Sequence, residues 1–167
     1  GLLAIPISNV PASKITDRDA KSSIETFLGN FHPAVIVLSG GNDLGQYPGR
    51  DLIEYHLLNY AKKHRLPALG ICRGMQAMAS FEGGSLKPVT GHVGARHQLL
   101  GSMRDDVNSY HNFSLDACPE SFRVLACSQD GEIEAIRHKE LPWEGWMWHP
   151  EREFPFFDPH IARLQRL

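Results

Sequence analysis

The fold of this 167-residue chain is decided by one stretch, Gly70-Ile71-Cys72-Arg73-Gly74-Met75-Gln76. The apolar run over residues 66–71 is typical of a buried parallel strand, and the apolar spacing over residues 73–81 predicts a helix. Cys72 is therefore expected on a strand-to-helix turn, where small residues two positions away on either side relieve crowding. This pattern indicates a nucleophile near the positive end of a helix dipole, which favours its thiolate. The alternative is a packing cysteine, which would not need two flanking glycines.

A second pattern lies near the end of the chain, in Gly145-Trp146-Met147-Trp148-His149-Pro150-Glu151. Its apolar part is typical of a strand, and side chains two positions apart in extended chain point to the same side. Glu151 is therefore expected to accept a hydrogen bond from His149 and to orient its imidazole. The other ring nitrogen is then free to take the proton of Cys72. Together the three side chains predict a nucleophile, a base and an orienting carboxylate.

A third pattern is the apolar run over residues 34–38, followed by Ser39-Gly40-Gly41-Asn42-Asp43. Glycines after a strand let backbone N–H groups face a ligand, although an ordinary turn has the same composition. A thiolate that attacks a carbonyl group needs hydrogen-bond donors for the developing oxyanion. The backbone N–H groups of Gly41 and Arg73 are the expected pair.

These motifs, with Val107-Asn108-Ser109-Tyr110-His111, resemble those of the class I glutamine amidotransferase family, and their order along the chain matches. Cys-Arg-Gly-Met-Gln and His-Pro-Glu on a short chain are similar to the gamma-glutamyl hydrolase branch, which includes gamma-glutamyl-gamma-aminobutyrate hydrolase. The resemblance implies hydrolysis of a gamma-glutamyl amide through a cysteine glutamyl-thioester, with release of glutamate and no cofactor. It also implies that the glutamyl moiety is held by Gly40, Gln76, Asn108, Ser109, Tyr110 and His111.

A further stretch, Gly91-His92-Val93-Gly94-Ala95-Arg96-His97, resembles a motif of hydrolases that act on a gamma-glutamyl CDP-amidate in capsule biosynthesis. In a basic loop, Arg96 and His97 are expected to meet a phosphorylated leaving group, because a guanidinium binds phosphate oxygens as a fork. The alternative is a loop whose charges are simply solvated. A metal site at His92 and His97 is disfavoured, since no acidic or thiol partner lies close in sequence to complete it. We therefore expect no metal.

Composition sets the class of protein. The chain is 42% hydrophobic, which suits one domain with a buried core, and its formal net charge of −2 gives no reason to expect a nucleic acid or membrane partner. There is no long apolar span and no leader-like start, and three cysteines do not suit a secreted disulfide framework. We expect a cytoplasmic protein whose partner is a small gamma-glutamyl substrate. A homodimer stays open.

The first half of the chain alternates apolar runs with helical spacing. This alternation predicts an α/β fold, a three-layer sandwich with a mainly parallel central sheet flanked by helices. The expected elements include a strand over residues 1–7, a helix over 15–29 that ends at a glycine, and a helix over 48–64. Residues 1–167 are expected to form a single glutamine amidotransferase-like hydrolase domain, lacking the extra strand and helix with which family members usually begin.

The second half has a different pattern. Short apolar runs over residues 122–127 and 132–137 flank Asp130-Gly131, which predicts an antiparallel hairpin that extends the sheet. Asp158 as N-cap and Pro159 at the first helical position predict a short terminal helix.

Two other functions remain open. In one, the chain is the glutaminase subunit of an amidotransferase that delivers ammonia to a synthase partner, and activity without a partner would distinguish a free hydrolase from it. In the other, it is a binding module with a reactive cysteine. A module that only senses oxidation would not need an oriented general base, so His149 and Glu151 argue against it.

Overall fold

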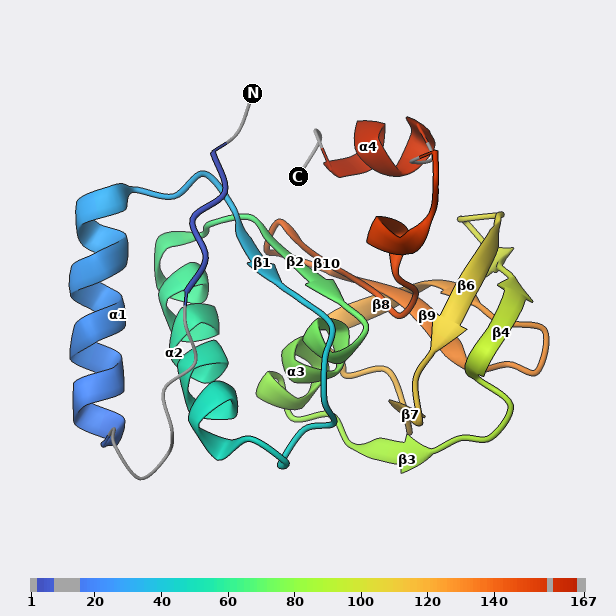
Figure 1. Ribbon diagram of the computed structural model, residues 1–167, viewed down its shortest axis with the longest axis horizontal. Helices are drawn as coiled ribbons and strands as arrows, with labels where there is room; N and C mark the ends of the chain where they lie inside the picture. Colours follow the sequence, from blue (N-terminus) through green and yellow to red (C-terminus); the bar gives the residue numbers. More distant parts are fainter. Residues whose placement is uncertain (1–2, 8–15, 156–157, 165–167) are drawn as a thin grey trace.

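The computed structural model describes residues 3–7, 16–155 and 158–164 (Figure 1). In the first half, the helices and strands alternate as the sequence predicts: α1 (Asp17–Phe31), β1 (Ile36–Leu38), α2 (Pro48–His64), β2 (Ala68–Ile71) and α3 (Arg73–Phe81). The predicted helices over 48–64 and 73–81 are confirmed at both ends. Pro48 occupies the start of α2, where a missing backbone N–H is tolerated.

The described central sheet has six strands in the order β1-β2-β10-β9-β8-β5. Its remaining strands are β5 (Leu100–Gly101), β8 (Phe122–Cys127), β9 (Ile133–His138) and β10 (Trp143–Trp146). Strands β1, β2 and β10 run parallel, whereas β9, β8 and β5 are added antiparallel. The α/β fold and the β8–β9 hairpin are confirmed. The sheet is mixed and not mainly parallel, because three of its six described strands, β5, β8 and β9, join by antiparallel pairing.

Two small sheets lie beside the central one. They pair β3 (Leu86–Pro88) with β7 (Phe113–Leu115), and β4 (Val93–Gln98) with β6 (Asp106–Tyr110). We call the second pair the β4–β6 ribbon. The stretch expected as a basic loop therefore forms, over most of its length, a paired strand. The ribbon contacts the short 3-10 helix η2 (Pro150–Arg152), which follows the predicted base.

The central sheet buries apolar side chains on both faces. Helices α2 and α3 pack on one face, and α1 packs on α2 farther from the sheet (Figure 1). On the other face, Trp146 and Trp148 stack with ring centroids 5.3 Å apart, and His160 of α4 (Asp158–Leu164) lies 5.4 Å from each. Trp143, Trp146 and Trp148 are all fully buried, so the three tryptophans are core residues.

Three details at the chain ends differ from expectation. Residues 3–7 form no strand, and Leu3 and Ile5 remain 87% and 44% exposed, so this apolar run lacks the burial that a core strand would have; residues 1–2 lie outside the described residues. Helix α1 runs past Gly29 and ends where His32 takes a left-handed conformation. Helix α4 already includes Asp158, which was expected as its N-cap.

Among the helices of the described residues, none combines the length and apolar character that a membrane crossing requires.

Candidate active site

Cys72 occupies a strained corner between β2 and α3. Its backbone angles, φ of 49° and ψ of −106°, lie in a region that residues other than glycine rarely adopt. A Cβ added to Gly70 would lie 2.5 Å from the Gly74 backbone, and one added to Gly74 would overlap the Leu38 carbonyl. Real Cβ atoms do not approach backbone this closely. Any side chain at Gly70 or Gly74 would therefore collide with neighbouring backbone, so both positions need glycine, as the sequence predicts.

The carboxyl ends of the three parallel strands meet beside Cys72. Ile71 pairs with Trp146, and the Cys72 N–H donates to the Trp146 carbonyl at 2.7 Å. His149 follows three residues after β10, and the Gly40 turn follows β1. Parallel strands bring their carboxyl ends to one edge, and this edge is where ligands bind in open α/β sheets.

His149 and Glu151 pair as the sequence predicts, with His149 Nδ1 2.6 Å from Glu151 Oε1. The imidazole also lies against the glycine turn, since a Cβ on Gly40 would lie 2.5 Å from its Cε1 and 3.5 Å from its Nε2. No hydrogen bond joins Cys72 to His149 among the residues that the structure describes. The Nε2 atom is thus free to contact another partner. Because Gly40 has no side chain, the ring can lie directly against its backbone.

Asn108 of β6 holds the backbone of His149 from both sides. Its Nδ2 donates to the His149 carbonyl at 2.8 Å, and its Oδ1 accepts from the His149 N–H at 2.9 Å. The Nδ2 group also lies 2.9 Å from Glu153 Oε1. An amide that satisfies both backbone groups of one residue fixes its position, so the β4–β6 ribbon positions His149.

Burial raises the pKa of the Cys72 thiol to about 11, against the opposing effects of the Arg73 backbone N–H and the Arg152 charge; Glu151 and Glu134 also raise it. This corrects the expectation that the helix dipole favours the thiolate. Cys72 is 5% exposed, and the loss of hydration of a thiolate there outweighs the local dipoles. The resting form is the thiol, which needs a base to become a nucleophile. Cys72, Cys118 and Cys127 are all free.

Glu151 has the opposite behaviour. Burial alone would raise the pKa of its carboxyl, but the hydrogen bond with His149, a backbone hydrogen bond and the nearby charges of His149 and Arg152 lower it overall. The carboxylate is therefore ionised next to His149 at neutral pH, which is the form that accepts a hydrogen bond.

A buried ion network beneath the corner is absent from the sequence prediction. The Arg73 guanidinium is 2% exposed and pairs with Asp51 and Glu54 of α2. Glu54 also binds Arg50 at 2.8 Å. The available sequence signal is Glu54, which has Asp51 three positions before it and Arg50 four positions before it, spacings at which helix side chains are neighbours. Buried charges need partners, so this network fixes the start of α3 against α2.

The same network reaches the glycine turn. Arg50 Nη2 donates to the carbonyls of Ser39 and Gly40 at 2.8 and 3.1 Å. In a trans peptide the C=O and the following N–H point in opposite directions. Because the Gly40 carbonyl faces Arg50, the N–H of Gly41 faces away from that guanidinium and remains available to a ligand.

The residues expected to hold a glutamyl group are placed unequally. Gln76 is 2% exposed and donates to the Phe113 carbonyl at 2.9 Å, while Ser109 is fully buried and donates to the His92 carbonyl at 2.7 Å. Both side chains therefore lie in the interior with backbone carbonyls as partners, and their contact with substrate stays a prediction. Tyr110 is 43% exposed and its ring lies edge-on to His149, with centroids 5.9 Å apart. Arg152, which belongs to none of the sequence motifs, lies over the Tyr110 ring at 4.4 Å.

Arg96 and His97, the residues expected to meet a phosphate, have different surroundings. The Arg96 guanidinium pairs with Asp106 on the neighbouring strand and with Glu153 at 3.0 Å, and Nη2 donates to the Asp106 carbonyl at 2.8 Å. Three of its five N–H donors therefore bind oxygens of the protein, although the side chain is 52% exposed. His97 points instead toward His92 and His111, with ring centroids of His92 and His97 4.2 Å apart.

Comparison with known proteins gives a consistent result. The model of the glutamine amidotransferase class-I family matches residues 10–165. Gamma-glutamyl-CDP-amidate hydrolase of Campylobacter jejuni is 36% identical over 124 residues, and the match covers 71% of this chain and 62% of that protein, which is less than two thirds of its length. A glutamine-hydrolyzing GMP synthase subunit of Methanothrix thermoacetophila is 32% identical over 145 residues, with 80% of each protein covered.

Solved structures show the same fold. A protein described as a GMP synthase subunit, from Thermoplasma acidophilum, superposes with a TM-score of 0.65 at 22% identity, over 83% of this chain and 71% of that one. A glutamine amidotransferase of Thermotoga maritima superposes with a TM-score of 0.62 at 20% identity, over 80% of this chain and 61% of that one. At these identities the likeness concerns the fold alone.

Proposed function

Because the chain belongs to the class I glutamine amidotransferase family, we propose that it hydrolyses a gamma-glutamyl amide through a thioester on Cys72. The catalytic residues are Cys72, His149 and Glu151, and the backbone N–H groups of Gly41 and Arg73 form the oxyanion hole. The products are glutamate and the amine-bearing leaving group.

In the first step, His149 Nε2 takes the proton of the Cys72 thiol as Sγ attacks the gamma carbonyl carbon. The carbonyl electron pair moves to its oxygen, which Gly41 and Arg73 stabilise. A base is required because the resting thiol is neutral, with a pKa of about 11. The ionised Glu151 stabilises the imidazolium that forms.

In the second step, the tetrahedral intermediate collapses and the carbon–nitrogen bond breaks. The imidazolium returns its proton to the departing nitrogen, which leaves as an amine, and the glutamyl group remains as a thioester. His149 then takes a proton from water, whose oxygen attacks the thioester carbonyl, and the thiol of Cys72 is regenerated with release of glutamate.

The observation that carries this proposal is the 2.6 Å contact between His149 Nδ1 and Glu151 Oε1 at the strand edge that also holds Cys72. It sets the proton on Nδ1 and leaves the lone pair of Nε2 free. The tautomer is thereby the one that a general base for Cys72 needs.

On the substrate side, we propose that Tyr110 and Arg152 replace Arg96 as contacts to the substrate. Both are exposed, they lie beside His149, and the Arg152 charge already acts on Cys72. A guanidinium in this position suits an anionic group on the leaving amine, such as the phosphate of a nucleotide amidate. The 36% identity to a gamma-glutamyl-CDP-amidate hydrolase favours the same class of substrate.

The test is glutamate release by the isolated protein from glutamine, gamma-glutamyl-gamma-aminobutyrate and gamma-glutamyl CDP-amidate. We expect the largest kcat/KM with the nucleotide amidate. Cys72→Ala serves as the blank and should lower the rate by about four orders of magnitude or more. Arg152→Ala should raise KM for the amidate more than for glutamine, with Arg123→Ala, an exposed arginine of β8, as the matched control. Equal rates for Cys72→Ala and the parent protein would reject the nucleophile.

A second function is favoured by the relatives named as GMP synthase subunits, one of which is covered over 80% of its length. In that case the chain is a glutaminase that passes ammonia to a synthase. The same panel distinguishes the two, since a free hydrolase turns over alone. Turnover of glutamine alone, and only after addition of a synthase partner, would replace the first proposal by the second.

A further inference from the structure

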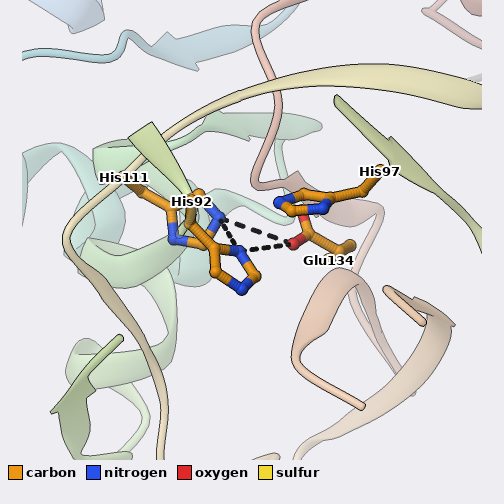
Figure 2. A group of neighbouring side chains, drawn as sticks. All are labelled: His92, His97, His111 and Glu134. Carbon is orange, nitrogen blue, oxygen red and sulfur yellow. Dashed lines mark hydrogen bonds and ion pairs between the residues drawn. The ribbon is translucent and has the colours of Figure 1, made fainter. Parts of the chain in front are cut away.

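Four side chains that the proposed reaction does not use converge between the β4–β6 ribbon and the central sheet. They are His92, His97, His111 and Glu134, which we call the histidine cluster (Figure 2). His92 directly precedes β4, His97 lies on β4, His111 directly follows β6, and Glu134 lies on β9. One ligand atom from each lies within 4.8 Å of the others.

The hydrogen bonds around the cluster determine which ring nitrogens carry protons. His111 Nδ1 lies 3.0 Å from the Phe113 carbonyl, which can only accept, so Nδ1 is the protonated nitrogen and Nε2 carries a lone pair. His92 Nε2 lies 2.9 Å from Asp130 Oδ2, an acceptor when ionised, which leaves the lone pair on Nδ1. When both rings are neutral, two lone pairs face each other across 3.2 Å.

Glu134 adds negative charge at the same point. Its side chain is fully buried, and among the described residues neither carboxylate oxygen has a hydrogen-bond partner. Its nearest neighbours in the cluster are His111 Nε2 at 3.4 Å and His92 Nδ1 at 3.6 Å. The buried Nε2 of His97 likewise lacks a hydrogen-bond partner. A buried carboxylate without a partner is strongly unfavourable, so this arrangement of acceptors requires a positive charge among them.

The spacing of the acceptors fits a metal ion. Zn²⁺ binds imidazole nitrogen and carboxylate oxygen at roughly 2.0–2.2 Å, so neighbouring ligands of a tetrahedral site lie about 3.3–3.5 Å apart. The separations of His92 Nδ1, His111 Nε2 and Glu134 Oε1 are 3.2, 3.4 and 3.6 Å. The Phe113 carbonyl and Asp130 bind the far nitrogens of two of these rings, as the groups behind metal-bound histidines do.

We propose that His92, His97, His111 and Glu134 bind one divalent transition-metal ion, with Zn²⁺ as the favoured ion. With four protein ligands and a buried centre the site is closed, so its role is structural. It fastens the β4–β6 ribbon to β9 of the central sheet. This inference is independent of the proposed hydrolase activity, because none of the four side chains belongs to the catalytic residues.

The test uses Cys72→Ala protein, so that the site cysteine cannot act as a ligand. Protein purified from zinc-supplemented medium should contain about one zinc per chain by elemental analysis. After removal of metal with a chelator, Co²⁺ titration should produce the intense visible bands of four-coordinate cobalt, and the melting temperature should rise with Co²⁺ or Zn²⁺.

Three variants locate the ion. Glu134→Gln retains the shape of the side chain and should weaken Co²⁺ binding by at least about 100-fold. Asp130→Asn leaves the four proposed ligands intact but removes the charge behind His92, and it should weaken Co²⁺ binding by about 10–100-fold. His64→Ala removes an exposed histidine of α2 and should bind Co²⁺ as the parent does.

Two results would overturn the proposal. One is a parent protein that contains no metal and whose melting temperature does not respond to excess Zn²⁺ or Co²⁺, since a proton shared by His92 and His111 would then supply the charge. The other is Co²⁺ binding that Glu134→Gln and Asp130→Asn leave unchanged. If Glu134→Gln does not fold, the cobalt spectrum of the parent and the Asp130→Asn affinity decide the matter.

Discussion

The Cys72 corner and the histidine cluster use similar polar side chains but are assembled over different lengths of chain. The corner consists of residues 70–74, and contacts between neighbouring backbones determine its geometry. The cluster collects its members from positions 92 to 134, from a separate ribbon and a strand of the main sheet. A site of the first kind can be found in a sequence motif. A site of the second kind appears only once the strands are paired.

The largest effect is expected from the ion pairs that join the Cys72 corner to α2, because these pairs link residues distant in sequence. Arg73→Ala should lower the free energy of unfolding by about 3–5 kcal/mol, because it leaves the carboxylates of Glu54 and Asp51 without their buried partner. Urea unfolding measures the change. Arg123→Ala, at an exposed position of β8, should stay within about 0.5 kcal/mol of the parent. A loss below about 1 kcal/mol for Arg73→Ala would mean that the corner needs no such support.

A second test addresses the corner itself. Gly74→Ala places a Cβ against the Leu38 carbonyl, which belongs to the backbone and cannot move aside as a side chain could. We therefore expect the free energy of unfolding to fall by about 1–3 kcal/mol or more. Gly29 also lies in a helix, but a Cβ there meets nothing within 4 Å. Gly29→Ala should therefore stabilise the protein by about 0.5–1 kcal/mol. Thermal unfolding of the two variants should show shifts of opposite sign.

Asn108 joins the two regions, because it extends from the ribbon to the backbone of His149. Asn108→Ala should lower kcat by about 10–100-fold with a smaller change in KM, since a displaced base affects proton transfer more than binding. Asn112, four residues farther along, is exposed, and Asn112→Ala serves as the control. A change in KM alone would place Asn108 in substrate binding, as the family resemblance suggests.

The ionisation of Cys72 gives a test based on pH. With a pKa of about 11, the reactive thiolate of the free enzyme should increase about tenfold per pH unit between pH 7 and pH 10. Alkylation by iodoacetamide, followed by mass spectrometry of the peptide that contains Cys72, should show this slope. A rate that is already constant near pH 7 would indicate a preformed thiolate paired with a protonated His149.

The smallest effect is expected at Glu151. Its pKa is lowered in the folded protein, so its contribution to stability is complete above the unfolded value of about 4.3 and is lost as the pH falls through the folded value. The melting temperature of the parent should exceed that of Glu151→Gln by about 1–3 °C at pH 7 and by less at pH 3. A difference that grows on acidification would contradict the hydrogen bond with His149 as the cause.

Local patterns predicted much of the fold. The helices over Pro48–His64 and Arg73–Phe81 have the predicted ends, because proline, glycine and apolar spacing act over a few residues. The run over residues 3–7 was wrongly predicted as a strand, since burial depends on a neighbouring strand and not on composition. The class of fold followed from the alternation of elements, whereas the share of antiparallel strands did not.

Side-chain partners were harder to predict than elements. Arg96 looked available for phosphate, but Glu153 approaches it from 57 positions away. The sequence alone disfavours a metal site at His92 and His97, because no acidic partner lies near them in the chain. Glu134 comes close to them only through the pairing of β9 within the sheet. Such contacts depend on register, which a single sequence specifies weakly.

The protonated resting state of Cys72 has a consequence for how long the protein survives oxidants. Peroxides attack thiolates, and at pH 7 a pKa of about 11 leaves about one Cys72 in ten thousand in that form. Because Cys72 as a residue is also only 5% exposed, we expect irreversible oxidation of the idle protein to be slow. The burial that obliges Cys72 to rely on a base thus also preserves it between turnovers.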